Sequence, residues 1–213
     1  MTEPAPKPSG VIIAGGGSAR FGGGDKFLSP LGQETVLDHV IRRARPQVSS
    51  LLLNVNDDVS RVRNFGIKVI CDDGLVSQKG TVGPLGGILA ALKYAENKGE
   101  DFLLTFASDT PFMPKDFAEK LCHAQRDGGR EIVIACSDGR PHPVMALWSV
   151  ALRGALEAYL LSGERRVMAF VQQQTYDEVS WAETRPDPFF NINHREDLQR
   201  AELYLKNTAS LLK

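Results

Sequence analysis

Glycines and two cationic side chains gather in one short stretch near the N-terminus. Six of the ten residues at positions 15–24 are glycine, and Arg20 and Lys26 lie within and just after this stretch. Glycine lets successive backbone N–H groups turn toward one point, because it tolerates positive φ and carries no side chain. Arg20 and Lys26 add positive charge. The stretch predicts a loop that binds the phosphates of a nucleoside triphosphate, and a flexible surface loop is the alternative.

Carboxylates follow two apolar segments of the sequence, at Asp72 and Asp73 and again at Asp109. A carboxylate just past a buried strand is costly unless it has a partner. Beside a triphosphate, Mg²⁺ binds one or two carboxylates together with phosphate oxygens, so Asp109 is predicted to be a metal ligand. The alternatives are a helix-capping role for Asp109 and an ordinary Asp-Gly turn at Asp73.

Amide side chains and a second glycine-rich segment supply further candidates. Asn54 and Asn56 end one predicted strand, and Asn191 and Asn193 follow an apolar approach. Amides both donate and accept hydrogen bonds, which suits the edge of a base or a pterin, although each could be a turn residue. The segment Gly-Pro-Leu-Gly-Gly at residues 83–87 enters a helix, and its glycines have either a packing or a ligand-binding role.

The remaining reactive side chains do not suggest a site of their own. No histidine has an evident nucleophile as partner, and the three cysteines have no CxxC spacing. Arg165 and Arg166 could clamp an anion, but a solvated helix face is the simpler interpretation. The cysteine pattern favours a reduced, cytoplasmic setting.

The hydrophobic pattern predicts which elements position these residues. Strands are predicted at 11–13, 51–56, 67–71, 102–107, 132–136 and 144–148, with a last strand or extended segment at 189–193. Helices are predicted at 35–45, 88–95, 149–161, 164–173, from Pro114 onward and from about residue 195. Alternating strands and helices predict an α/β fold with a mostly parallel sheet and helices on both faces. The short link between 132–136 and 144–148 predicts an antiparallel pair, and ligands are expected at the carboxyl ends of the parallel strands.

Length and charge exclude several function classes. The 213 residues suit one domain at 11–213 after a disordered tail at 1–10. Lys and Arg number 25 and Asp and Glu number 26, so the formal net charge is −1. Such a balance argues against a non-specific nucleic-acid coat. We find no stretch apolar enough for a membrane span and no signal peptide, so neither nucleic acid nor membrane is an expected partner.

Taken in order, the motifs resemble those of the molybdenum cofactor guanylyltransferases, a family of the nucleotidyltransferase superfamily. The motifs are IIAGGGSARFGGGDK, NVN, KVICDD, GPLGG, SDTP, HPV, GERRVM and NIN. The likeness extends from Val11 to about Leu205. The glycine-rich motif alone marks only the superfamily, whereas GPLGG, HPV, GERRVM and NIN make the match specific. Two departures are Phe21, where the family often has Met, and a long segment between Asp72 and Gly83.

The resemblance implies a Rossmann-like domain of the nucleotide-diphospho-sugar transferase type. It implies that GMP is transferred from GTP to the terminal phosphate of molybdopterin with Mg²⁺ present, and that pyrophosphate is released. Transient contacts with proteins that donate or accept the molybdenum cofactor are also implied. The implied nucleotide contacts are Ile13, Ala14, Gly15, Lys26, Asn54, Asp72 and Asp109, and the implied pterin contacts are Gly87, Arg165, Asn191 and Asn193. Arg20, Lys26 and Asp109 are the predicted catalytic residues, and Asp109 is the predicted Mg²⁺ ligand.

Several alternatives remain open at this stage. The nearest are a CTP-dependent molybdopterin cytidylyltransferase and a sugar-phosphate nucleotidyltransferase, although Ala-Gly-Gly at residues 14–16 resembles the enzymes that use guanine nucleotides. A non-catalytic adaptor that binds GTP and the cofactor is a different class of function. The presence of both Lys26 and Asp109 argues against it, because binding alone does not need a metal-binding carboxylate at that place. A flavodoxin-like redox module is the least specific alternative.

Overall fold

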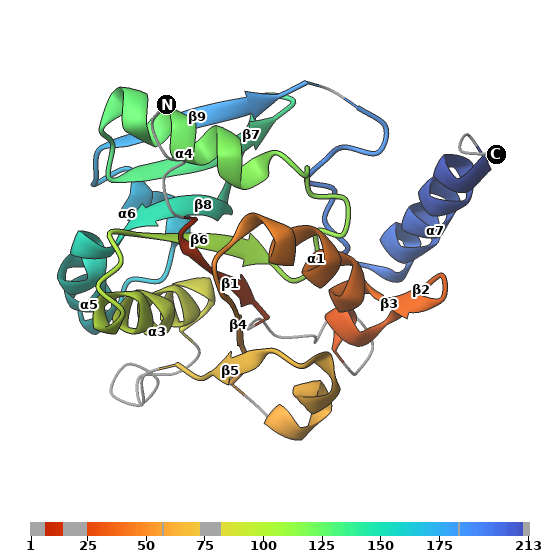
Figure 1. The fold of residues 1–213 in the computed structure, drawn as a ribbon, viewed down its shortest axis with the longest axis horizontal. Coiled ribbons are helices and arrows are strands. Elements are labelled where there is room, and N and C mark those ends of the chain that lie inside the picture. Colours follow the sequence, from red (N-terminus) through yellow and green to blue (C-terminus); the bar gives the residue numbers. More distant parts are fainter. Residues whose placement is uncertain (1–6, 15–24, 57, 73–81, 183, 211–213) are drawn as a thin grey trace.

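A seven-stranded sheet runs through the centre of the fold (Figure 1). The computed structural model describes residues 7–14, 25–56, 58–72, 82–182 and 184–210. The strand order is β5-β4-β1-β6-β8-β7-β9. The strands are β1 (Ser9–Ile13), β4 (Leu51–Asn54), β5 (Lys68–Ile70), β6 (Phe102–Ala107), β7 (Ile132–Ser137), β8 (Arg140–Ser149) and β9 (Tyr176–Trp181). Of these seven, β8 alone runs antiparallel to its neighbours, so the prediction of a mostly parallel sheet with one reversed strand is confirmed.

The register brings the carboxyl ends of four parallel strands into one row. Ile13 of β1 pairs with Asn54 of β4 on one side and with Ala107 of β6 on the other, and Asn54 pairs with Ile70 of β5. The chain passes from β1 outward to β4 and β5 and then returns to the opposite side of β1 with β6. Open α/β sheets bind ligands at the place where the strand order reverses in this way.

Helices cover both faces of the sheet, as predicted (Figure 1). One face packs against α3 (Pro84–Asn97), α5 (Arg153–Leu161) and α6 (Val167–Val171). The other face packs against α1 (Val36–Ala44) and α4 (Phe117–Gly128). The short 3₁₀ helices are η2 (Lys26–Leu28), η3 (Arg45–Gln47), η4 (Val59–Phe65) and η5 (Val150–Leu152). Two buried clusters of side chains, one on each face of the sheet, therefore hold the central strands and the row of carboxyl ends in place.

The C-terminal helix packs in a third, separate cluster. Helix α7 (Arg195–Ser210) lies beside a small hairpin formed by β2 (Pro30–Leu31) and β3 (Glu34–Thr35) (Figure 1). Its fully buried Ala201 packs with Leu31, Val36 and Ile192. Ile192 belongs to the segment that precedes the helix, so α7 anchors that segment to the rest of the fold.

Local signals explain where several helices begin. The Thr35 side chain accepts from the Asp38 N–H at 3.2 Å and the Asp38 carboxylate accepts from the Thr35 N–H at 2.9 Å, which is a capping box at the start of α1. Pro84 occupies the first turn of α3, where its missing N–H costs nothing, and Gly83 before it has a φ of 65°. Among the described residues, none of the helices has the length and apolar character to cross a bilayer.

The structure corrects four element predictions. Residues 189–193 form no strand and follow an irregular path, while the seventh strand, β9, lies earlier in the chain at Tyr176–Trp181. Helix α4 begins at Phe117 rather than at Pro114, and β1 begins at Ser9 rather than at Val11. Strand β8 begins at Arg140 rather than at Val144, so His142 lies in a strand and not in a loop.

Candidate functional site

An ion pair joins two residues that the sequence predicted to act together. Lys26 begins η2, directly after the glycine-rich stretch, and Asp109 lies two residues beyond the end of β6. The Lys26 ammonium donates to the Asp109 carboxylate and, at 3.1 Å, to the amide oxygen of Asn193. Asp109 is 6% exposed, so its carboxylate has the partner that a buried charge requires. The cation, the carboxylate and a third predicted residue therefore meet at the carboxyl edge of the sheet.

Backbone contacts hold the two predicted asparagines at this edge. The N–H of Ile192 donates to the carbonyl of Asp109 at 3.0 Å, and the N–H of Asn193 donates to Asp197 in the first turn of α7 at 3.1 Å. Ile192 is fully buried while Asn191 and Asn193 on either side of it are exposed. Burial of the Ile192 side chain thus fixes the segment in place, and the flanking Asn191 and Asn193 lie at the site.

A second polar pair lies on the other side of β1. The side-chain amide of Asn54 donates to the carboxylate of Asp72 at 2.9 Å, and the backbone N–H of Asp72 donates to the side chain of Asn56 at 2.9 Å. Burial raises the pKa of Asp72, and the hydrogen bonds from Asn54 and Asn56 oppose that rise. The polar residues that end β4 and follow β5 therefore form one hydrogen-bonded group.

Two glycines of the GPLGG segment make room for this group. A Cβ on Gly86 would clash with the carboxylate of Asp72, and a Cβ on Gly87 would clash with the side-chain amide of Asn54. Both glycines lie in the first turns of α3, so the carboxylate rests against the positive end of the helix. The packing interpretation of these glycines thus holds, and it also explains how Asn54 and Asp72 are placed.

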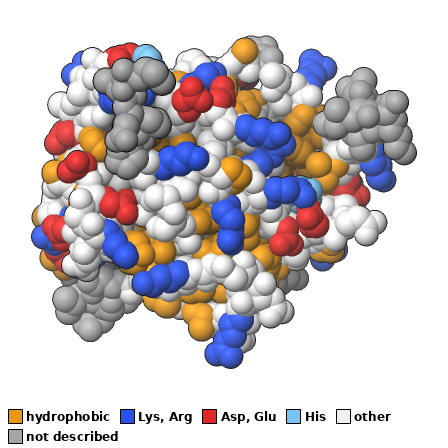
Figure 2. Space-filling view, in the orientation of Figure 1, with side chains coloured by type: hydrophobic (Ala, Val, Ile, Leu, Met, Phe, Trp, Pro, Cys, Tyr) orange, Lys and Arg blue, Asp and Glu red, His pale blue; other side chains and the backbone are white. Residues whose placement is uncertain are grey.

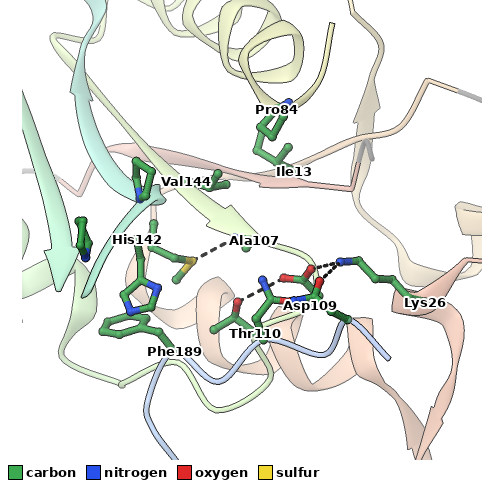
Figure 3. Close-up of a pocket in the computed structure, with 14 residues that line it drawn as sticks. Ile13, Lys26, Pro84, Ala107, Asp109, Thr110, His142, Val144 and Phe189 are labelled. Carbon is green, nitrogen blue, oxygen red and sulfur yellow. Dashed lines mark hydrogen bonds and ion pairs between the residues drawn. The ribbon is translucent and has the colours of Figure 1, made fainter. Parts of the chain in front are cut away.

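A cavity of about 300 Å³ opens beside the ion pair (Figure 3). Residues predicted to bind substrates form one part of its wall, and residues to which the sequence analysis assigned no role form the rest. The lining residues are Ile13, Lys26, Pro84, Ala107, Asp109, Thr110, Pro141, His142, Pro143, Val144, Met145, Phe189, Asn191 and Asn193. Figure 3 shows Lys26 reaching toward Asp109 at one end, with His142 and Phe189 at the other. The cavity therefore has a charged end and a largely apolar end.

The apolar end contains a hydrogen-bonded chain that sequence analysis missed. Ser137 Oγ lies 2.8 Å from His142 Nε2 and 2.9 and 3.0 Å from the two carboxylate oxygens of Asp187. The ring of Phe189 lies over the imidazole, with 4.9 Å between the ring centroids. Burial lowers the pKa of His142; Asp187 raises it and Arg140 lowers it by smaller amounts. The HPV motif was the available signal, but Ser137 links His142 to Asp187, and Ser137 and Asp187 are 50 residues apart in sequence.

The chemistry of the donors fits a divalent metal held mainly by a substrate. In the described part of the chain, no group of three or more His, Cys, Asp or Glu side chains could hold a metal ion. Asp109 offers one carboxylate next to the cavity. Mg²⁺ commonly takes one or two carboxylates and completes its shell with phosphate oxygens and water, so a single well-placed carboxylate suffices.

Two predicted pterin contacts, Gly87 and Arg165, are not among the residues that line the cavity. Gly15 and Arg20 lie outside the described residues. Arg165 donates to the carbonyls of Leu160 and Glu164 near the end of α5, at 2.7 and 2.6 Å, and it does not line the cavity. Ala14 continues the β1–β4 ladder through its N–H, which donates to the Asn54 carbonyl at 3.1 Å.

Comparison with known proteins identifies relatives along nearly the whole chain. The family model for the MobA-like NTP transferase domain matches residues 10–179. A molybdenum cofactor guanylyltransferase of Mesorhizobium japonicum is 40% identical over 207 residues, which cover 95% of this chain and 98% of that protein. Another from Rhizobium meliloti is 42% identical over 206 residues, covering 93% and 92%.

A solved structure supports the fold. The molybdopterin-guanine dinucleotide biosynthesis protein A from Archaeoglobus fulgidus superposes with a TM-score of 0.74 at 23% identity, covering 93% of this chain and 99% of that one. The sheet order, the ion pair at its carboxyl edge and the relatives that match along nearly the whole chain point the same way. The chain belongs to the molybdenum cofactor guanylyltransferase family, within the MobA-like NTP transferases.

Proposed function

We propose that the protein transfers GMP from GTP to the terminal phosphate of molybdopterin and releases pyrophosphate. The observation that carries the proposal is the meeting of Lys26, Asp109 and Asn193 in one cavity at the carboxyl edge of the sheet. The names of the relatives at about 40% identity supply the substrates. We further propose that residues 11–213 act as a single nucleotidyltransferase domain.

The nucleotide side of the site is built from β1, β4 and β5. Asn54 and Asp72 lie together against the start of α3, where an amide and a carboxylate can bind the hydroxyls of a ribose or the N–H edge of a base. Lys26 supplies the positive charge for the triphosphate. Gly15 and Arg20 extend this role in the proposal, with backbone N–H groups and a guanidinium directed at the phosphates.

The acceptor side of the site lies between Asp109 and β8. Asn191 and Asn193 offer amides to the acceptor, and the apolar wall receives its flat ring system. An oxygen of the acceptor phosphate attacks the α-phosphorus of GTP and forms a new P–O bond. The bond from the α-phosphorus to the bridging oxygen breaks, and its electron pair leaves with pyrophosphate. The acceptor phosphate is already ionised at neutral pH, so the reaction needs no general base.

Charge neutralisation and orientation are the contributions of the protein. Lys26 stabilises the negative charge that develops on the leaving pyrophosphate. Holding two reactants in line can lower the barrier by about 7–11 kcal/mol. Asp109 would hold Mg²⁺, which would supply positive charge against the phosphates of the substrate.

A nucleotide panel tests the proposal. The purified protein is incubated with molybdopterin, Mg²⁺ and each of GTP, CTP, ATP and UTP, while pyrophosphate release is followed and the product mass is measured. We expect release with GTP and the mass of the guanine dinucleotide. Turnover with CTP alone would identify a cytidylyltransferase, and GTP binding with no turnover would identify an adaptor; either result would contradict the proposal.

A further inference from the structure

The wall of the cavity opposite the ion pair contains a histidine with one bonded ring nitrogen. His142 is the third residue of β8, and its Nε2 lies 2.8 Å from Ser137 Oγ on the neighbouring strand. No described residue contacts its Nδ1 by a hydrogen bond. His142 lines the cavity, and Figure 3 shows one ring nitrogen facing the side on which Thr110 lies. The imidazole therefore has one edge fixed by the protein and one edge open to the cavity.

The bonding partners determine which nitrogen carries the proton. Ser137 has a single hydroxyl proton, and it lies 2.9 and 3.0 Å from the two oxygens of Asp187. A carboxylate accepts and does not donate, so Ser137 donates to Asp187 and accepts from His142 Nε2–H. In a neutral imidazole the other nitrogen then has a free lone pair. Burial favours the neutral ring, because it lowers the pKa of His142.

One short segment fixes both the partner and the plane of the ring. The N–H of Phe189 donates to the Asp187 carboxylate at 2.7 Å, and the Phe189 ring packs on the imidazole. Phe189 is itself 2% exposed and packs edge-on against Trp181 and Phe117. The imidazole is consequently held in one orientation by the core, which is how binding sites preorganise a polar group.

The surroundings of His142 favour a flat ligand with hydrogen-bond donors. Pro141, Pro143, Val144, Met145 and Phe189 give this end of the cavity apolar walls. It lies over β6 and β8, on the opposite side of β1 from the Asn54–Asp72 pair. The Asn54–Asp72 pair thus lies away from this end of the cavity, and under the proposed function the ligand at the His142 end is the acceptor.

We propose that His142 is a specificity-determining residue of the acceptor subsite, where its Nδ1 accepts a hydrogen bond from an N–H group of a flat heteroaromatic acceptor. This inference rests on the proposed function, since it assigns the cavity beside β8 to the acceptor. Ser137 and Asp187 are positioning residues: they contact no substrate and act by fixing the tautomer of His142. Acceptors that lack the N–H donor would leave the lone pair unpaired and would bind more weakly.

Steady-state kinetics test the contact with substrate. His142→Phe keeps a flat ring but removes the acceptor atom, so the KM for molybdopterin should rise about fivefold to tenfold, the value of one hydrogen bond. The Kd for GTP should stay within about twofold of the wild type. The matched control is His123→Phe, because His123 on α4 has a side chain 69% exposed to solvent and should leave both constants unchanged.

Nuclear magnetic resonance tests the tautomer without any turnover. The chain has four histidines, so long-range proton–nitrogen spectra of protein with ¹⁵N-labelled histidine can be assigned with the two histidine variants. We expect the Nε2–H tautomer for His142 in the wild type. In Ser137→Ala we expect a mixture of tautomers and an increase in the KM for molybdopterin that is smaller than in His142→Phe.

The outcomes separate this inference from the function on which it rests. A wild type that releases no pyrophosphate with GTP and molybdopterin contradicts the proposed function. An active wild type with an unchanged molybdopterin KM in His142→Phe contradicts only the role of His142. An Nδ1–H tautomer in the wild type also overturns the inference, because the nitrogen facing the cavity would then donate.

Discussion

At the scale of single residues, one ammonium group connects the two halves of the site. Lys26 contacts Asp109, which follows β6, and Asn193, which precedes α7. Replacing Lys26 leaves the Asp109 carboxylate, which is 9% exposed, without its main partner, and replacing Asp109 leaves the Lys26 ammonium without its own. An unpaired buried charge destabilises the folded state. Variants at these positions therefore need both a stability and an activity measurement.

Asp109→Ala should lower kcat/KM for GMP transfer by about 100-fold or more, because it removes the carboxylate proposed to hold the metal next to the developing charge. Pyrophosphate release with GTP and molybdopterin is the measurement, and circular dichroism verifies the fold. Asp127→Ala is the matched control, since the Asp127 side chain on α4 is 68% exposed. Turnover of Asp109→Ala at the wild-type rate would remove this residue from the mechanism.

Asp72 predicts a pH dependence of stability. Burial raises its pKa in the folded protein above the ordinary value of 3.8. The folded state then binds a proton more tightly than the unfolded state, so the contribution to stability is complete below 3.8 and is lost as the pH rises through the raised pKa. We therefore compare the free energies of unfolding of the wild type and Asp72→Asn. The wild-type value minus the variant value should fall as the pH rises from 3.8 through the raised pKa of Asp72, and it should be constant at higher pH.

Urea unfolding of the wild type and Asp72→Asn at a series of pH values measures this difference. Asn at position 72 keeps an oxygen that can accept from Asn54 but does not titrate, so the comparison isolates the carboxyl group. A difference that grows with pH over the same interval would show that hydrogen bonding from Asn54 and Asn56, rather than burial, determines the pKa.

At the scale of elements, the start of α3 is shaped by what packs against it. Gly86 and Gly87 have helical backbone conformations and not positive φ. Glycine is therefore needed at these positions because a side chain would not fit, and not because the backbone requires its conformational freedom. Asn54 and Asp72 occupy that space. The close approach joins two strand ends and a helix into the part of the site that we propose binds the nucleotide.

Gly87→Ala should destabilise the fold by about 1–3 kcal/mol, because the new methyl group clashes with the Asn54 side chain. The weakened Asn54–Asp72 pair should also raise the Kd for GTP. Gly154→Ala in α5 is the control: no atom lies within 4 Å of its added Cβ, so helix propensity should stabilise that variant by up to about 1 kcal/mol. Thermal unfolding and GTP titration test both. Equal effects of the two substitutions would contradict the steric argument.

The sequence analysis located those elements whose own residues form a clear apolar run or a helical apolar stripe. Apolar runs such as Phe102–Ala107 and Ile132–Ser137 predict buried strands directly from the sequence. Because Asp109 follows the first of these runs, its place at the carboxyl edge of the sheet could be predicted as well. Strand β9 was missed because it lies at the edge of the sheet, where the exposed Glu178 and Ser180 lie on either side of the half-buried Val179 and the segment has no continuous apolar run. The apolar residues at 189–193 suggested a strand, but Phe189 and Ile192 are buried by side-chain packing instead.

The missed part of the site depends on contacts between distant parts of the chain. Ser137 and Asp187 are 50 residues apart in sequence, and neither stands in a motif that implies the other. The contact between Gly87 and Asn54 is likewise a property of packing. Single-sequence patterns can indicate which residues carry chemistry, but the pairing of side chains across strands follows only from the tertiary structure.

At the scale of the whole molecule, the protein has no large excess of positive charge that could attract an anionic substrate. The chain carries a net charge of −1, and on the face in Figure 2 Lys and Arg side chains are scattered among Asp and Glu and do not form one continuous patch. Under the proposed function, electrostatic attraction of GTP would come from the positive charge around Lys26 and would act over about one Debye length, roughly 8–10 Å at physiological salt.

Helix α7 should influence the acceptor side more than the nucleotide side. Ala201→Glu places a charge in the cluster of Leu31, Val36 and Ile192, which should undock the helix and loosen the Asn191–Asn193 segment. We expect the KM for molybdopterin to rise about tenfold or more and the Kd for GTP to change less. Gln199→Glu introduces the same charge at an exposed position of α7 and is the control. A larger effect on GTP than on molybdopterin would contradict this assignment.

The reversed direction of β8 has a consequence for how such an enzyme can diversify. Because β8 runs opposite to its neighbours, it contributes its beginning to the edge where the other strands end, and His142 and Met145 lie within the paired strand. The nucleotide side relies instead on residues at or beyond strand ends. Within the proposed acceptor side, the wall at His142 can therefore change only by altering a paired strand, whereas Asn191 and Asn193 lie in an irregular segment where substitutions leave the sheet intact.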